Sequence, residues 1–450
     1  MTFQSLGLSK AVLDALASKN YTDPTPIQRQ AIPALLDGRD LLGIAQTGTG
    51  KTAAFIAPSI DNLVKANERR KPMRCRMLVL APTRELASQI ADSARAYAKF
   101  TKLTVATVFG GVPIARNRRD TSAGVDILVA TPGRLMDLIE QRCMSLGDLE
   151  ILVLDEADQM LDLGFIHTLR KIVAMLPKNR QSLFFSATMP KDIKDLADKF
   201  LTDPVEVKVA PVATTAERVE QYVTFVNQAE KQALLTLFFQ KNEIDRALVF
   251  TRTKHGADRV VKLLASNGIA SNAIHGNKSQ PQREKALAEF RAGKVPILVA
   301  TDIAARGIDV SGVSHVVNFE LPNVAEQYVH RIGRTARAGA DGVAFAFCAE
   351  DERAYLRSIE KLTRQSISVV PLPANFQAEA DRIKSSRVGP IPAERPERPR
   401  QQQGPRRPRA THSAQPAGAG RPGGNRGGGN RRGRGGGGGG GGRRPASAQG

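Results

Sequence analysis

Short apolar segments alternate with helix-like stretches along most of this 450-residue chain, and this rhythm restricts the possible fold more than any other feature. In the first half the apolar segments are MLVLAPT, VDILVATPG, LEILVLD and QSLFFSAT. Stretches with helical periodicity, such as RELASQIADSARAYAKF, lie between them. This alternation predicts βαβ units that build a parallel sheet.

The same rhythm repeats in the second half of the chain. Its apolar segments are RALVFTRT, KVPILVATD, VSHVVNFELP and DGVAFAFCA. The connector near residues 207–218 has few large apolar residues, which favours a hinge between two bodies. The sequence therefore predicts a first α/β domain over residues 1–207, a flexible linker over 208–218 and a second α/β domain over 219–372.

The C-terminal segment has a different composition. Periodicity ends near Ala374, and from Glu394 the chain is rich in Pro, Arg, Gln and then Gly. The last 60 residues hold 13 Arg, no Lys and 2 Glu, so they carry +11 of the net charge of +21. Such a segment cannot bury a core, which predicts a disordered basic tail over residues 373–450. With RGG at Arg426 and Arg434, it is expected to tether RNA weakly, or to act as a solubilising linker.

Charge and cysteine usage limit the class of protein. The basic excess favours a polyanionic partner, usually nucleic acid. The longest apolar run is the seven residues of 343–349, against the ~20 that a membrane span requires. The first residues, MTFQSLGLSK, lack the pattern of a secretory signal. Three cysteines far apart fit a reducing compartment, so we expect a cytoplasmic protein with no membrane partner.

A phosphate-binding loop is predicted between an apolar segment and a helix-like stretch. The loop reads AQTGTGKT and comprises Ala45, Gln46, Thr47, Gly48, Thr49, Gly50, Lys51 and Thr52. Its glycines let backbone N–H groups face a phosphate at the positive end of a helix. Lys51 would neutralise the β- and γ-phosphates, and Thr52 would ligate Mg²⁺. Ala45 stands where the usual pattern has Gly, and alone the stretch could be an ordinary Gly-rich turn.

Two adjacent carboxylates follow the apolar segment that ends in VLDEAD. Alone, Asp155 could be a helix N-cap. A predicted phosphate-binding loop lies upstream, with its Lys51 104 residues before Asp155, so we favour a chemical role for both acids. Asp155 would hold Mg²⁺ through its waters, and Glu156 would orient or deprotonate the water that attacks the γ-phosphate.

Taken together, AQTGTGKT, the DEAD tetrapeptide at 155–158 and SAT at 186–188 resemble the DEAD-box RNA helicases over about residues 3–347. The resemblance implies two tandem RecA-like domains, ATP and Mg²⁺ as cofactors, and RNA as partner. In YTDPTPIQ it implies that Tyr21 stacks on the adenine and that Gln28 hydrogen-bonds its edge. It further implies that Asp158, Ser186 and Thr188 link the nucleotide state to the RNA grip.

The resemblance also implies an RNA-binding surface on both domains. Strand-end turns with N–H groups, hydroxyls and arginines suit phosphate oxygens. In the first domain the implied residues are Pro82, Thr83, Arg84, Gly110, Gly111, Thr131, Gly133 and Arg134. In the second domain they are Arg252, Gln280, Arg283 and Thr301. Taken singly, each could be a turn residue or a solvated charge.

The second domain has no Gly-rich Lys-Thr loop, so we expect it not to bind a nucleotide by itself. HRIGRTARAG resembles the arginine-finger element of the family, with Arg334 and Arg337 one helical turn apart on one face, aimed at a γ-phosphate. ATDIAARGIDV would place Arg306 near RNA or the interface and Asp309 at the ribose. Ala336 occupies a position that is usually Gly in the family.

The sequence thus predicts an RNA-stimulated ATPase that separates short RNA duplexes and remodels ribonucleoprotein. The short N-terminal lead-in and the basic tail resemble the bacterial RhlE-type subgroup. Two alternatives stay open: an ATP-gated RNA clamp or annealing chaperone, and a DNA translocase. We expect a monomeric core, and ribonucleoprotein or ribosome-assembly partners only by kinship.

Overall fold

The computed structural model describes residues 2–46, 48–209, 219–242, 244–305, 310, 312–336 and 342–385. Most of the predicted linker and tail lie outside these residues. So do four residues with predicted roles: Thr47, Arg306, Asp309 and Arg337.

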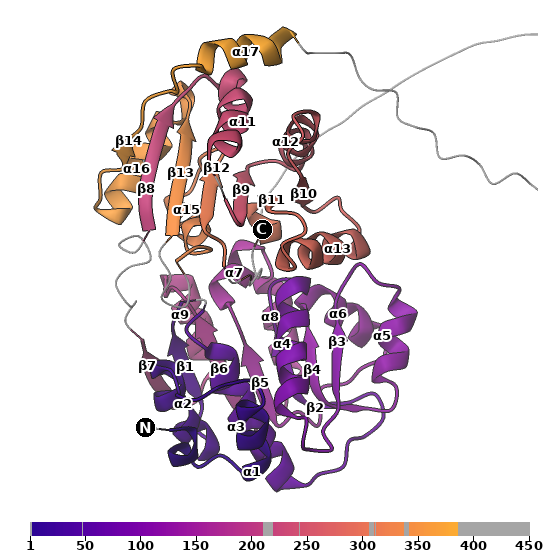
Figure 1. Cartoon of the computed structure of the whole chain (residues 1–450). Helices are drawn as coiled ribbons and strands as arrows, with labels where there is room; N and C mark the ends of the chain where they lie inside the picture. Colours follow the sequence, from indigo (N-terminus) through magenta and orange to yellow (C-terminus); the bar gives the residue numbers. More distant parts are fainter. Residues whose placement is uncertain are drawn as a thin grey trace, which may run out of the picture. The chain divides into compact units, whose positions relative to one another are not determined.

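The first domain is a seven-stranded sheet in which all the recorded strand pairs are parallel (Figure 1). Its strands are β1 (Leu41–Ile44), β2 (Cys75–Leu80), β3 (Val105–Val108), β4 (Val125–Ala130), β5 (Ile151–Leu154), β6 (Gln181–Ser186) and β7 (Val205–Lys208). They lie in the order β3-β4-β2-β5-β6-β1-β7. The helices are η1 (Phe3–Leu6), α1 (Lys10–Ala17), α2 (Pro26–Leu36), α3 (Lys51–Ala66), α4 (Arg84–Tyr97), α5 (Ile114–Thr121), α6 (Pro132–Glu140), α7 (Ala157–Asp162), α8 (Ile166–Ala174) and α9 (Lys191–Phe200).

The second domain is another parallel sheet of seven strands. Its strands are β8 (Val219–Phe225), β9 (Ala247–Thr251), β10 (Ser271–Ile274), β11 (Ile297–Thr301), β12 (His315–Asn318), β13 (Gly342–Cys348) and β14 (Ser368–Val369). Its helices are η2 (Gln228–Glu230), α11 (Lys231–Lys241), α12 (Lys254–Ser266), α13 (Gln280–Arg291), α14 (Asp302–Ala305), α15 (Ala325–Ile332), η3 (Glu350–Glu352), α16 (Arg353–Thr363) and α17 (Phe376–Ser385).

The strand order of the second sheet is β10-β11-β9-β12-β13-β8-β14. Adding seven to each strand label of the first sheet reproduces this order, so the two domains have one topology. Each strand of the second domain therefore has a counterpart in the first, such as β8 for β1 and β12 for β5. The predicted tandem α/β architecture is confirmed.

Helices cover both faces of each sheet, which explains the continuous apolar runs in the sequence. Successive residues of a strand point to opposite faces, and in β2 Met77 and Val79 join one core cluster while Leu78 and Leu80 join the other. Among the described residues, no helix combines the length and hydropathy that crossing a bilayer requires.

One helix lies inside the segment for which the sequence predicts a disordered tail from residue 373. This helix, α17, packs on α11 through Phe376 and Ala380, which are buried, with Ile383 beside them. Apolar residues spaced by four and three fall on one helical face, and that face covers the end of the second core. The ordered part of the chain therefore reaches at least to Ser385.

Candidate functional site

The loop between β1 and α3 has the backbone of a phosphate cradle. Gly48 and Gly50 take φ values of +88° and +94°, which favour glycine. A Cβ on Gly50 would stand 2.5 Å from Nε2 of Gln28, so no side chain fits there. Lys51 opens α3, and its Nζ donates to the carbonyl oxygen of Ala45 at 2.9 Å. The cradle thus lies at the positive end of a 16-residue helix.

Asp155 follows β5 and faces this cradle. Its Oδ1 lies 4.0 Å from Nζ of Lys51, and both side chains are buried. Burial raises the pKa of Asp155 to about 6, while Lys51 opposes the rise and Glu156 adds to it. Oδ1 accepts no hydrogen bond from the described residues. A buried carboxylate oxygen with open coordination fits Mg²⁺ or one of its waters.

Glu156 stands in an uncommon backbone conformation. It precedes α7 with φ at +54°, in the left-handed region, and is 2% exposed. A non-glycine residue there costs on the order of 1 kcal/mol. Glycine at this position would avoid that cost but would supply no carboxylate. The strained backbone therefore indicates that the carboxylate of Glu156 has a role here.

A cavity of about 250 Å³ adjoins the cradle. Its lining includes Lys51, Thr52, Asp155 and Glu156, and the aromatic rings of Tyr21 and Tyr97. The hydroxyl of Tyr97 donates to that of Tyr21 at 3.2 Å. The cavity therefore combines a cation, carboxylates and aromatic faces, the groups that a nucleoside triphosphate requires.

Among the residues of α4 that line this cavity are three with polar groups, which the sequence analysis missed. They are Gln89, Ser93 and Tyr97. Nε2 of Gln89 is buried and has no hydrogen-bond partner among the described residues. Their spacing of four places them on one helical face, which is a signal that a helical projection of the stretch after β2 could have shown.

Gln28, predicted to bind adenine, is 4% exposed and contacts the cradle from α2. Its Oε1 accepts from the N–H of Thr25 at 2.8 Å in a capping box, and its Nε2 donates to the carbonyl oxygen of Gly50 at 3.1 Å. The structure thus uses both ends of this amide within the chain, and the adenine contact stays a prediction.

Asp158 connects the DEAD segment to the SAT segment. Its Oδ2 accepts from the backbone N–H groups of Ala187 at 3.2 Å and Thr188 at 3.0 Å, and from the hydroxyl of Thr188 at 3.0 Å. The hydroxyl of Ser186 donates to the carbonyl oxygen of Thr188 at 2.7 Å. Three donors on one carboxylate oxygen fix the turn after β6 relative to α7.

The predicted RNA-binding residues of the first domain come together at one sheet edge. They follow β2, β3 and β4, which are neighbours in the sheet. The guanidinium of Arg84 lies against Gly110 and Gly111, where a Cβ on Gly111 would meet Nη1 at 1.9 Å. Nη1 of Arg134 donates to the carbonyl oxygen of Val112 at 2.9 Å. Glycine at 111 therefore suits both its positive φ of +85° and the close approach of the arginine.

The remaining members of this set are turn and cap residues at the same edge. Thr83 caps α4, and its hydroxyl accepts from the N–H of Leu86 at 3.3 Å. Thr131 precedes α6, which begins at Pro132. Pro82 and Gly133 lie beside these caps in the sequence. Their contact with RNA stays a prediction.

The second-domain set follows the counterpart strands. Arg252 comes directly after β9, Thr301 ends β11, and Gln280 and Arg283 lie in α13 after β10. Nε of Arg283 donates to Oε1 of Glu85 at 2.7 Å. Since β9, β10 and β11 correspond to β2, β3 and β4, both domains present their predicted RNA-binding residues at equivalent edges.

The expectation for the arginine-finger segment needs correction. It placed Arg334 and Arg337 one helical turn apart, but α15 ends at Ile332, so Arg334 lies in the turn beyond the helix. Gly333 is the C-terminal cap of α15, and its N–H donates to the carbonyl oxygen of Val329 at 3.0 Å. Arg334 is 6% exposed. Ala336, in the position usually held by Gly, has φ at +53°, a conformation that glycine adopts without strain.

In comparison with known proteins, each domain matches a helicase domain family. The DEAD/DEAH box helicase family matches residues 25–196, and the helicase conserved C-terminal domain matches residues 229–339. The RNA helicase CrhR of Synechocystis sp. is 43% identical over 384 residues, which cover 85% of this chain and 77% of that protein. DEAD-box ATP-dependent RNA helicase 30 of Arabidopsis thaliana is 42% identical over 371 residues. The match covers 82% of this chain but only 63% of the Arabidopsis protein.

Solved structures with this fold carry both ligands. S. cerevisiae Dbp5 bound to RNA and ADP BeF3 superposes with a TM-score of 0.73 at 30% identity, covering 85% of this chain and 99% of that one. Mss116p bound to ssRNA and AMP-PNP superposes with a TM-score of 0.75 at 26% identity, covering 84% of this chain and 82% of that one. With the cradle, the DEAD segment and both domain matches in agreement, the chain belongs to the family of DEAD-box RNA helicases.

Proposed function

We propose that this chain is an RNA-stimulated ATPase that uses ATP to separate short RNA duplexes locally. The observation that carries the proposal is the cavity of about 250 Å³ in which Lys51, Asp155 and Glu156 surround the phosphate cradle. Relatives of this chain are named RNA helicases, and Dbp5 is described with RNA and ADP BeF3 bound.

In this proposal the first domain binds ATP and prepares the attacking water. Backbone N–H groups of residues 48–52 and the ammonium of Lys51 receive the phosphates. Glu156 orients the water and accepts its proton. Thr52 and Asp155 would hold Mg²⁺, which neutralises charge on the β- and γ-phosphates. No cluster of three metal-ligating side chains occurs among the described residues, so the phosphates and waters would complete the coordination.

RNA would lie along the equivalent strand edges of both domains. The groups there are arginines, threonine hydroxyls and glycine turns, which contact phosphates and 2′-hydroxyls and not base edges. Low sequence specificity follows from such contacts. A strand bent to fit the closed arrangement of both domains cannot keep A-form pairing with its partner. Binding of RNA and binding of ATP would both favour this closed state, so the two ligands would be thermodynamically coupled.

Several finer assignments stay predictions. The bacterial RhlE-type subgroup rests on the short lead-in and basic tail alone. The reducing cytoplasm rests on three separate cysteines, which are free thiols in the structure. The monomeric core, ribonucleoprotein partners and the domain limits rest on the sequence.

ATP hydrolysis measured with RNA or with DNA of the same sequence tests the proposed function. We expect RNA to stimulate turnover strongly and DNA to leave it near the basal rate, because 2′-hydroxyls distinguish the two. Displacement of a short duplex should require ATP and fail with a non-hydrolysable analogue at multiple turnover. Equal stimulation by DNA would identify a translocase, and ATP-dependent RNA binding without duplex displacement would identify an annealing or clamp protein.

Removal of residues 395–450 tests the tail. Residues 395–450 hold 13 Arg and one Glu and so carry +12, and their loss should raise the RNA KM and flatten its dependence on salt while leaving ATP binding unchanged. The measurement is the RNA KM of the ATPase at two salt concentrations. An unchanged KM would show that the tail is a solubilising segment only.

A further inference from the structure

The shared topology of the two domains allows their strand ends to be compared one by one. The nucleotide groups of the first domain follow β1, β5 and β6. The counterparts of these strands are β8, β12 and β13. The second domain should therefore hold its equivalent of a phosphate site where these three strands end.

Lys231 occupies the place of Lys51 in this comparison. Lys51 is the first residue of α3, which follows β1, and Lys231 is the first residue of α11, which follows β8. Where the first domain has a glycine-rich loop, the second has the short helix η2 at residues 228–230. The second domain thus has a lysine at the start of the equivalent helix but no glycine-rich phosphate cradle before that helix.

The partner of Lys231 is a carboxylate of the same chain. Nζ of Lys231 donates to Oε2 of Glu352, which follows β13, and both side chains have 0% exposure. Burial lowers the pKa of Lys231, and the charge of Glu352 opposes that shift. Each group therefore depends on the other for a counter-charge inside the protein.

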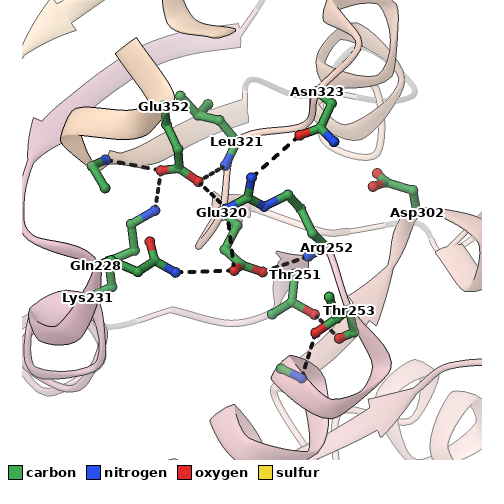
Figure 2. Close-up of polar contacts among 12 residues, drawn as sticks. Gln228, Lys231, Thr251, Arg252, Thr253, Asp302, Glu320, Leu321, Asn323 and Glu352 are labelled. Carbon is green, nitrogen blue, oxygen red and sulfur yellow. Dashed lines mark hydrogen bonds and ion pairs between the residues drawn. The ribbon is translucent and has the colours of Figure 1, made fainter. Parts of the chain in front are cut away.

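Glu352 receives the same types of donor that a bound phosphate receives. Its Oε2 accepts from the N–H of Ala349 at 3.0 Å, and its Oε1 accepts from the N–H of Leu321 at 3.3 Å. Nη2 of Arg252 lies 3.2 Å from Oε1. Figure 2 shows Lys231 and Arg252 converging on this carboxylate, with the backbone of Leu321 beside it. Two cations and two backbone N–H groups surround this carboxylate, as is typical of a phosphate site, and Arg252 also lies 3.8 Å from a second carboxylate, that of Glu320.

The two domains differ in what fills the site. In the first, Nζ of Lys51 stands 4.0 Å from Asp155 beside an open cavity of about 250 Å³. In the second, the carboxylate of Glu352 occupies the corresponding space beside the lysine. In the second domain a carboxylate of the chain itself thus lies beside the lysine, where the first domain leaves space for an external anion.

This anion also reaches the RNA-binding edge. The backbone N–H of Arg252 donates to Oε2 of Glu320 at 2.8 Å, while its guanidinium contacts Glu352. The next residue, Thr253, caps α12, and its hydroxyl accepts from the N–H of Gly256 at 3.0 Å. The turn after β9 is thus held by two carboxylates. Glu320 accepts from the backbone of Arg252, and Glu352 contacts the side chain of Arg252.

We propose that Glu352 is a built-in substitute for phosphate, which closes the second domain's phosphate site and, through Arg252, acts as a positioning residue for the RNA-binding turn after β9. On this view Arg252 acts through its contact with Glu352 more than as a phosphate ligand. The role at the RNA edge rests on the proposed function, whereas the role as internal anion does not.

Glu352→Ala with formate as an external carboxylate tests the internal anion. The variant should unfold at a lower temperature, and formate should restore its stability more than sodium chloride at equal ionic strength. Lys231→Met combined with Glu352→Ala lacks the fully buried one of the two cations that would bind formate, so formate should stabilise it beyond chloride much less than it stabilises Glu352→Ala. If Glu352→Ala does not fold unaided, the same comparison uses its refolding yield. Equal effects of formate and chloride on Glu352→Ala would overturn the proposal.

The positioning role is read from RNA-stimulated ATP hydrolysis by the full chain. Glu352→Gln keeps the shape but loses the charge, so the RNA KM should rise by about 10-fold, the effect of one weakened charge-assisted contact, with kcat at saturating RNA preserved. Glu350→Ala is the matched control, because Glu350 lies in the same short helix η3 as Glu352 but is exposed, and it pairs with Arg353 at the start of α16. A change in kcat with the KM unmoved, or an equal effect of the control, would overturn the positioning role. Rescue by formate with no change in RNA KM would keep the internal anion and reject its link to RNA.

Discussion

Glu156→Gln is expected to bind ATP and RNA as the parent chain does and to lose about 10³-fold in ATP turnover. The amide has the shape of the carboxylate, so it fits the same buried position after β5. It cannot accept a proton from the attacking water, and general-base catalysis typically contributes 10²–10⁴-fold. The measurement is steady-state ATP hydrolysis at saturating RNA, alongside equilibrium binding of a fluorescent nucleotide.

Glu140→Gln provides the control for Glu156→Gln. Glu140 is an exposed carboxylate at the end of α6 in the same domain, and its loss should leave turnover unchanged. Turnover by Glu156→Gln within a few fold of the parent would remove Glu156 from the chemistry. Loss of nucleotide binding in this variant would instead show that the charge of Glu156 is needed to bind the nucleotide.

Arg334→Ala should reduce RNA-stimulated turnover by about 10³-fold or more while ATP binding to the first domain is retained. An arginine that neutralises transition-state charge on a γ-phosphate typically contributes 10³–10⁵ in rate. Since the cradle, Asp155 and Glu156 all belong to the first domain, a cation from the second would make hydrolysis depend on domain closure. The measurement is kcat at saturating ATP and RNA.

Arg357→Ala is the matched control for Arg334→Ala, because Arg357 is an exposed arginine on α16 of the same domain. Arg331 is unsuitable. Its guanidinium is fixed within the second domain by Asp302 at 2.6 and 2.7 Å and by Asn318 at 3.0 Å, so its removal would test folding. A residual rate for Arg334→Ala close to that of the parent would contradict a site shared between the domains.

Most central strands could be predicted from the sequence, whereas the edge strands and β8, which lies between β13 and β14, could not. The strands β2, β4, β9 and β11 are buried along their whole length, so their apolar runs stand out. At the edges, β7 alternates exposed and covered residues and β14 has two exposed residues. A short strand with one neighbour buries little area, so its composition does not differ from that of a loop.

The candidate site shows the same division. Residues in contiguous motifs, from Ala45 to Thr52 and from Asp155 to Asp158, could be found because each segment carries its chemistry within a few positions. The cluster of Lys231, Arg252 and Glu352 comes from three strand ends far apart in the sequence. Nothing local marks these residues, since only the shared sheet order brings them together. The bend after Ile332 was missed because a pattern of arginines does not show where a helix ends.

The contact between Gln28 and Gly50 ties the first turn of α3 to α2. One amide holds the carbonyl of Gly50, and no methyl group fits between them. Displacement of either helix therefore strains the other, so a substitution on the outer side of α2 can weaken triphosphate affinity without touching the ligand. Variants selected for altered nucleotide affinity should be sought along α2 as well as in the glycine-rich loop.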